Sequence, residues 1–199
     1  YPFGFGLSYT AFAYSDLKLE KDPFTGGEMK VSFTITNTGN RKGAETAQIY
    51  VKNPTGCHYL RAEKELKGFI KTELLPGESK QVSVSLDERS FSVYDEEMQK
   101  FLMPSGKYQI LVAASSQDIR LSAPLSVKGV SYERDDRELL FEYFDPEVRI
   151  QEISHKQFLR LYGRETSHFD RTEPGSYTMY HSLRQLSEHS GMARGFLRL

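Results

Sequence analysis

The stretch Met29–Thr36 constrains the fold most, because apolar and polar side chains alternate along it without interruption. A period of two places its four apolar side chains on one face of an extended chain, which predicts a half-buried strand. The turn residues Asn37-Thr38-Gly39-Asn40 follow at once. The apolar residues of the stretch are Met29, Val31, Phe33 and Ile35.

The same alternation recurs up to about residue 127, in short runs separated by turn residues such as Pro76-Gly77-Glu78 and Pro104-Ser105-Gly106. About seven short strands with a turn every ~8–12 residues predict a two-sheet β-sandwich. No spacing typical of βαβ units occurs, so a parallel sheet is not expected. The expected strands cover residues 12–19, 29–36, 47–51, 66–74, 82–86, 108–112 and a last one through 119–121.

The first ten residues, Tyr1–Thr10, carry four aromatic rings together with Pro2, Gly4 and Gly6. Proline fixes one backbone angle and glycine permits turns, so we expect a tightly bent segment with large apolar rings. Two hypotheses follow. The rings fill the core of their own domain as an N-terminal strand, or they are clamped against a domain outside this chain. The sequence opens without Met in the middle of a motif, so we expect it to be part of a larger protein.

Several motifs in this order resemble those of glycoside hydrolase family 3, the β-glucosidase and β-xylosidase family. The segment Pro2–Thr10 followed by Phe12 is similar to the junction that leads into the fibronectin type III-like domain of that family. The resemblance covers about residues 1–127. The other matching motifs are Asn37-Thr38-Gly39, Gln48-Ile49-Tyr50-Val51, Lys64-Glu65-Leu66-Lys67-Gly68-Phe69, Leu75-Pro76-Gly77-Glu78-Ser79 and Ser115-Ser116-Gln117-Asp118-Ile119-Arg120.

This resemblance implies a mainly β fold, an immunoglobulin/fibronectin type III-like sandwich of about seven strands with a partly helical C-terminal extension. The expected organisation is a junction segment over 1–11, the sandwich over 12–129 and the extension over 130–199. The family uses a retaining mechanism with an Asp nucleophile and a Glu acid/base on two other domains. No segment here resembles either motif, so we assign no catalytic residue and expect no cofactor.

The expected role is therefore that of a non-catalytic accessory domain. Its partners would be the catalytic domains of the same parent chain, which acts on β-glucosides or β-xylosides. Phe3, Phe5 and Tyr9 are the candidate interdomain contacts.

A second hypothesis makes the chain a carbohydrate- or protein-binding module. The stretch 53–63 is long for a connection between strands, and long loops on rigid sandwiches often bind ligands. Its candidate contact residues are His58, Tyr59 and Arg61. Packing of this loop against a neighbouring domain of the same parent is the alternative. The tyrosines considered for stacking on a sugar are Tyr50, Tyr59 and Tyr94.

A third hypothesis is self-association into a homo-oligomer through the apolar residues of 139–199. In that extension Ser154 is expected to cap a short helix that stops at Gly163. A second helix is expected to start at Thr178 or Ser182 and to end near Gly191. The last apolar residues are Met192, Phe196 and Leu197.

Other site classes find little support. The acidic residues of Asp95-Glu96-Glu97 and of Asp135-Asp136 are adjacent in sequence, and neighbours along a strand point to opposite faces. The single cysteine, Cys57, excludes an internal disulfide. The five histidines lack metal-ligand spacing, so no metal is expected. A net charge of −1 without a basic arm argues against nucleic acid, and no apolar run approaches the ~20 residues that span a membrane.

Overall fold

The structure is a computed structural model and describes residues 1–54, 59–95, 98–131, 135–163, 186–187 and 190–196. The chain divides into two units, Tyr1–Asp135 and Asp136–Leu199. Each unit is described by itself below. The boundary expected between residues 129 and 130 stays a prediction.

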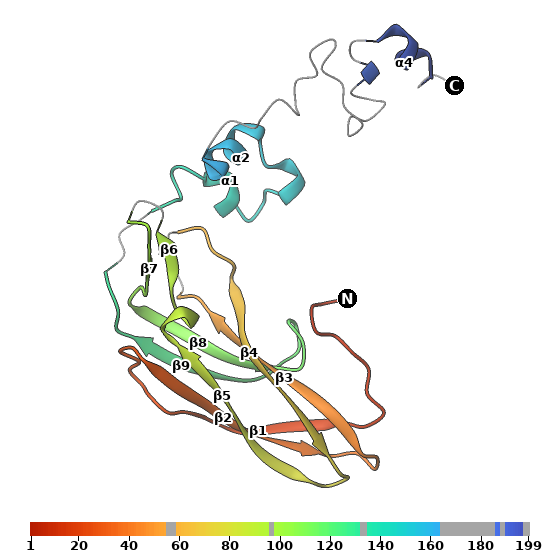
Figure 1. Ribbon diagram of the computed structural model, residues 1–199, viewed down its shortest axis with the longest axis vertical. Helices are drawn as coiled ribbons and strands as arrows, with labels where there is room; N and C mark the ends of the chain where they lie inside the picture. Colours follow the sequence, from red (N-terminus) through yellow and green to blue (C-terminus); the bar gives the residue numbers. More distant parts are fainter. Residues whose placement is uncertain (55–58, 96–97, 132–134, 164–185, 188–189, 197–199) are drawn as a thin grey trace. The chain divides into compact units, whose positions relative to one another are not determined.

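The first unit is an antiparallel β-sandwich (Figure 1). One sheet has the order β1-β2-β5, the other has the order β4-β3-β8-β9, and β6 and β7 form a separate hairpin. The predicted sandwich of about seven strands is thereby confirmed. The strands are β1 Phe12–Leu19, β2 Glu28–Asn37, β3 Gly43–Lys52, β4 Lys64–Leu74, β5 Ser79–Asp87, β6 Val93–Asp95, β7 Lys100–Leu102, β8 Gly106–Ala113 and β9 Ile119–Val127, with a 3₁₀ turn at Glu88–Ser90.

The core lies between the two larger sheets and takes one face of each. The alternation of β2 is confirmed, because its four apolar side chains are all fully buried. Phe33 lies opposite Val82 of β5 in the register, and both point into the core. Tyr108 of β8 packs edge-on against Phe91, with ring centroids 5.7 Å apart. Burial of such aromatic rings contributes much of the hydrophobic stabilisation of a sandwich.

Asn37, at the end of β2, ties the turn between the two sheets together. Its side chain is fully buried and donates to the carbonyl oxygens of Arg41 (2.7 Å) and Leu74 (3.1 Å). Its Oδ1 accepts from the hydroxyl of Thr10 (2.6 Å) and the amide of Gly39 (3.1 Å). A buried amide with all its groups bonded fixes both the turn and the entry of the N-terminal segment.

β3 departs from simple alternation, because it is buried on both faces. Ala47, Ile49 and Val51 point into the core, as expected. Gln48 and Tyr50, on the opposite face, are also buried, with exposed fractions of only 5% and 4%. Something within the first unit therefore covers the outer face of this strand.

The second unit contains short helices among its described residues. They are α1 Phe141–Phe144, the 3₁₀ turn Ile150–Glu152, α2 His155–Tyr162 and α4 Gly191–Phe196. The predicted caps of α2 are confirmed: the hydroxyl of Ser154 accepts from the amide of Gln157, and Gly163 ends the helix with a φ of 73°.

The second expected helix is only partly testable, because residues 164–185 and 188–189 lie outside the described part. The described residues 186–187 are helical, Ser190 is not, and α4 begins at Gly191, so the expected end of that helix near Gly191 stays a prediction. Among the described residues, no helix is long and apolar enough to cross a membrane.

Candidate functional site

The N-terminal segment, residues 1–11, exposes its apolar side chains instead of burying them. The described chain begins its first strand only at Phe12. Tyr1 and Leu7 are fully or almost fully exposed, and Phe3, Phe5 and Tyr9 expose 68%, 48% and 92%. The hypothesis that these rings fill the core of their own domain is therefore wrong.

The backbone of this segment is nevertheless held on the sandwich. The carbonyl oxygen of Phe3 accepts from the amide of Ser116 at 2.8 Å, and a turn closes where the amide of Phe5 donates to the carbonyl of Pro2 at 3.1 Å. Farther along, the carbonyl of Ala11 accepts from the amide of Thr38 at 2.8 Å. The segment is thus fixed by its main chain while its rings remain exposed.

Gly4 lies directly over Gln48 of β3. It has a φ of 77°, a conformation that L side chains rarely adopt, and an added Cβ would overlap Nε2 of Gln48. Gln48 is itself held on both sides. Its Oε1 accepts from the hydroxyl of Tyr50 at 2.6 Å, and its Nε2 donates to the carbonyl of Ala114 at 3.3 Å. Gly4 and Gln48 together set how closely the segment approaches the sheet.

An open groove of about 870 Å³ lies along this segment, bordered by the start of β3 and the turn between β8 and β9. Its charged lining is internally paired, because Arg120 donates to Asp118 at 2.7 Å and Tyr14 donates to Glu45 at 2.7 Å. Burial and the bond to Glu45 raise the pKa of Tyr14 well above its usual value, so this hydroxyl stays protonated. The groove is shaped by these contacts.

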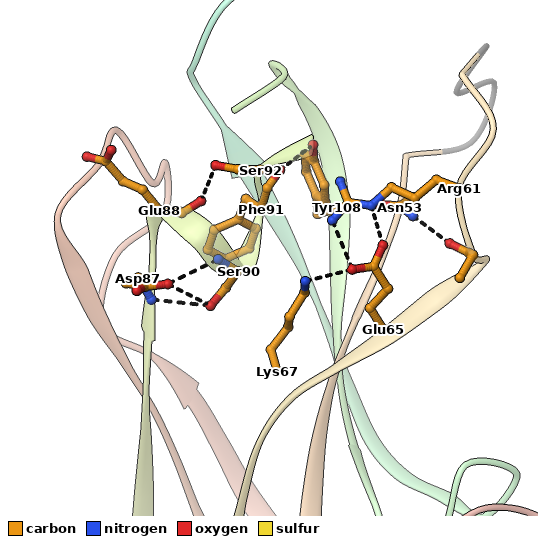
Figure 2. A network of polar contacts seen from close by, with 11 residues as sticks. Asn53, Arg61, Glu65, Lys67, Asp87, Glu88, Ser90, Phe91, Ser92 and Tyr108 are labelled. Carbon is orange, nitrogen blue, oxygen red and sulfur yellow. Dashed lines mark hydrogen bonds and ion pairs between the residues drawn. The ribbon is translucent and has the colours of Figure 1, made fainter. Parts of the chain in front are cut away.

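A second polar feature caps the end of the core at the base of the loop between β3 and β4 (Figure 2). The Arg61 guanidinium contacts both carboxylate oxygens of Glu65, and Lys67 donates to the same carboxylate at 2.6 Å. These side chains are largely buried, with exposures of 7% for Arg61, 27% for Glu65 and 18% for Lys67. Burial alone would raise the pKa of Glu65, but the two cations hold it below its ordinary value.

The same network fixes the base of the loop. The side-chain amide of Asn53 donates to the carbonyl of Ala62 at 2.6 Å (Figure 2). Lys52 pairs with Glu63 at 2.7 Å. Nη1 of Arg61 and Oδ1 of Asn53 are buried, and neither has a hydrogen-bond partner among the residues that the structure describes. Arg61 therefore serves as an internal brace of the loop in the described structure.

Comparison with known proteins places this architecture. A family model described as "Fibronectin type III-like domain" matches residues 45–116. The thermostable β-glucosidase B of Acetivibrio thermocellus is 42% identical over 130 residues, which cover 65% of this chain and 17% of that protein. A putative β-xylosidase of Formosa agariphila is 45% identical over 121 residues, which cover 60% of this chain and 16% of that protein.

Solved structures agree. A crystal structure of a GH3 β-glucosidase from Bifidobacterium adolescentis matches with a TM-score of 0.61 at 31% identity, over 81% of this chain and 23% of that one. β-Glucosidase 3B from Thermotoga neapolitana, solved with α-D-glucose, matches with a TM-score of 0.58 at 37% identity, over 66% and 18%. The sandwich is a fibronectin type III-like domain. Its resemblance to part of glycoside hydrolase family 3 enzymes is confirmed, and the chain spans about a sixth of the length of the curated relatives it matches.

Of the loop residues predicted as contacts, the two that the structure describes, Tyr59 and Arg61, do not form an exposed contact surface. Tyr59 is buried, with 7% exposure, and Arg61 is braced by Glu65. His58 and Cys57 lie outside the described residues. Of the tyrosines considered for sugar stacking, Tyr50 is buried and only Tyr94 is substantially exposed. That part of the binding-module hypothesis is wrong for Tyr50 and Tyr59.

The described residues of the two acidic runs considered in the sequence accept local backbone hydrogen bonds. Oδ1 of Asp95 accepts from the amide of Met98 at 2.7 Å, and the carbonyl of Asp136 accepts from the amide of Leu140 at 2.7 Å. Glu96 and Glu97 lie outside the described residues. Among the described residues, no group of three or more His, Cys, Asp or Glu side chains could hold a metal ion.

Sequence reasoning missed two residues that organise these features. The sequence singles out Gln48 only as part of a motif, although it supports the N-terminal segment. Glu65 was recognised only as part of a motif, although it pairs with two cations. A glutamine between buried apolar neighbours and a Lys-Glu-Leu-Lys run are weak signals by themselves, because polar side chains on strands are common.

Proposed function

We propose that this chain is a non-catalytic accessory part of a family 3 glycoside hydrolase whose other domains hydrolyse β-glucosides or β-xylosides with retention. The observation that carries the proposal is the N-terminal segment, whose main chain is fixed on the sandwich while its rings are exposed. Phe3, Phe5 and Tyr9 would contact the catalytic domains. The relatives, a β-glucosidase and a putative β-xylosidase, support the substrate class.

The energetic argument rests on the cost of exposed rings. Monomeric soluble proteins rarely expose contiguous apolar patches larger than a few hundred Å², and larger exposed patches usually mark interaction sites. A segment held at Phe3 and Ala11 by main-chain bonds loses little further entropy when its rings are covered. Such preorganisation suits a permanent contact between domains.

The chemistry supports an accessory role. A retaining site needs two carboxyl groups about 5–5.5 Å apart, one of them able to act as acid and base. Glu65 is committed to Arg61 and Lys67, and Glu45 accepts from Tyr14. A carboxylate held ionised between two cations is unsuited to donate a proton to a leaving group.

The test is hydrolysis of p-nitrophenyl β-glucoside and β-xyloside by this chain and by the full-length protein. We expect the full-length protein to turn over at least one substrate and this chain to turn over neither. Turnover by the isolated chain would overturn the accessory role. Failure of the full-length protein on both would overturn the proposed substrate class.

The junction is tested in the full-length protein with Phe3→Ser, Phe5→Ser and Tyr9→Ser combined. We expect a lower thermal unfolding temperature and a loss of activity, because the catalytic domains lose their apolar contact. The matched control carries three serine substitutions at exposed lysines of the β1-β2-β5 sheet, namely Lys18, Lys30 and Lys80. Equal behaviour of the two triple variants would contradict the junction.

A further inference from the structure

The two sheets of the sandwich differ on their outward faces, the faces that point away from the core. On the β1-β2-β5 sheet, every outward pair along β2 and β5 is polar. Ser32 lies opposite Ser83, and Thr34 lies opposite Gln81. On the β4-β3-β8-β9 sheet, Leu66, Tyr50 and Leu111 occupy one outward row.

A second outward row continues this apolar surface. Phe69 lies opposite Gln48, which lies opposite Ala113, which in turn pairs with Ile119. The inner part of the surface is buried, since Tyr50, Leu111 and Ala113 form a cluster of their own. The outer part is exposed: Phe69 by 67%, and Leu66 and Ile119 by 37% each. We call these six apolar residues the outward apolar face.

The N-terminal segment meets this face at Gln48, between Phe69 and Ala113 in the second row. Gly4 stands over Gln48, and the carbonyl of Phe3 bonds to Ser116 beyond the end of β8. The exposed rings of the segment and the exposed ring of Phe69 thus approach the same strand, β3, from the segment and from β4 respectively. The two surfaces are continuous through Gln48.

We propose that the exposed part of the outward apolar face, Leu66, Phe69 and Ile119, forms one interaction surface with the N-terminal segment, and that its occupant is an apolar face of a neighbouring domain in the same polypeptide. This rests on the proposed function. Phe69 would be its central anchor, since it is the most exposed of these residues and phenylalanine is enriched at the cores of protein interfaces.

The length of the relatives favours a neighbouring domain over a second copy of this chain. The matched region makes up only 17% of the Acetivibrio enzyme and 23% of the Bifidobacterium structure. A domain in the same polypeptide meets this face at an effective concentration of roughly millimolar size, which a separate copy does not reach at ordinary concentrations.

The charges at the rim define the complementary surface. Lys64 and Lys71 flank Leu66 and Phe69 along β4, and both lie on outward rows. The occupant should therefore present a flat apolar centre with carboxylates at its edge. Opposite charges at a rim orient a contact more than they strengthen it.

Thiol labelling of the full-length protein tests the proposal. Cys57 is the one cysteine of this sequence and is replaced by serine. Phe69→Cys and Ser83→Cys then place single thiols on the two outward faces, and Tyr9→Cys places one on the N-terminal segment. Each labelling rate in the native protein is divided by the rate in denaturant. The labelling of other cysteines in the full-length chain is measured in the protein that carries only Cys57→Ser, and it is subtracted.

We expect Phe69→Cys to be labelled at least about tenfold more slowly than Ser83→Cys, which corresponds to an opening free energy of about 1.4 kcal/mol. Dilution should leave this protection unchanged. Equal rates at the two positions would overturn the proposal. If Tyr9→Cys were still protected in that case, the proposed junction would stand alone. If Tyr9→Cys were labelled as fast as Ser83→Cys, both the proposed face and the proposed junction would be overturned. Protection that fades on dilution would assign the face to a second copy and would overturn the proposed occupant.

Discussion

The outward faces of the two sheets are built from the same alternation along their strands, but one is polar and the other is largely apolar. β2 and β5 place Ser32, Thr34 and Ser83 outward, while β3 and β4 place Tyr50 and Phe69 outward. Alternation along a strand decides which side chains share a face, but it does not decide whether that face meets water. The difference teaches that the β4-β3-β8-β9 sheet is built to be covered on both sides.

The largest effect expected from breaking this contrast is at Tyr50. Tyr50→Ala removes an outward ring that is 96% buried and leaves Oε1 of Gln48 without its donor. We expect the free energy of unfolding of this chain to fall by about 3 kcal/mol, as for other buried aromatic truncations. Thr34→Ala on the other outward face should change it by less than about 0.5 kcal/mol. Urea denaturation of both variants measures the difference, and similar values for the two would contradict it.

The second largest effect is expected at Glu65, a charged residue on the inward side of β4, the strand that also carries Phe69. Glu65→Gln leaves Arg61 and Lys67 beside a neutral amide in a largely buried position. We expect a loss of about 2 kcal/mol, less than for a fully buried pair because Glu65 keeps some exposure. Glu73→Gln is the matched control on β4, since its pair with Lys42 is exposed on both partners. A loss at position 73 as large as that at 65 would contradict this ranking.

The pH dependence gives a separate measurement of Glu65. The pKa of this carboxyl is lower in the folded chain than its ordinary value of 4.5. The stabilisation is therefore complete above that value and is lost as the pH falls through the folded pKa. Between pH 7 and pH 3 the unsubstituted chain should lose more stability than Glu65→Gln does. Parallel curves for the two proteins would show that Glu65 is not the group responsible.

Much of the sandwich was predictable, because buried alternation is a strong local signal. The inward set of β2 and the caps of α2 at Ser154 and Gly163 are confirmed. The burial of Tyr50 and Tyr59 was not predictable, since Tyr50 lies on the outward side of an alternating strand and Tyr59 lies outside the strands. The exposure of Phe3 and Tyr9 was one of two hypotheses, and only the structure separates them.

Gly4 offers a smaller and more selective test of how the segment is fixed. Gly4→Ala introduces strain at a φ of 77° and an overlap with Gln48, whereas Gly77→Ala introduces similar strain at 75° with nothing within 4 Å of the added carbon. We expect each to cost about 1 kcal/mol from the backbone, with a further loss at Gly4 alone.

A double-mutant cycle isolates that further loss. In the background of Gln48→Ala the overlap disappears, so Gly4→Ala should cost only as much as Gly77→Ala does. The measurement is urea denaturation, with limited proteolysis of residues 1–11 as a second readout. If the cost of Gly4→Ala were the same with and without Gln48, the contact would not set the approach of the segment.

The smallest expected effect is at Phe69. It tests whether this chain itself covers the Phe69 side chain, as it covers Tyr50, or leaves it exposed. Phe69 shares the outward side of the sheet with Tyr50, but it exposes 67% of its surface in place of 4%. Phe69→Ser should therefore change the unfolding free energy of the 199-residue chain by less than about 0.5 kcal/mol, as at other exposed positions. The same substitution in the full-length protein should cost more, because there the ring loses its proposed contact. A loss in the isolated chain as large as that of Tyr50→Ala would mean that this chain already covers Phe69, and the two outward faces would then differ in composition alone.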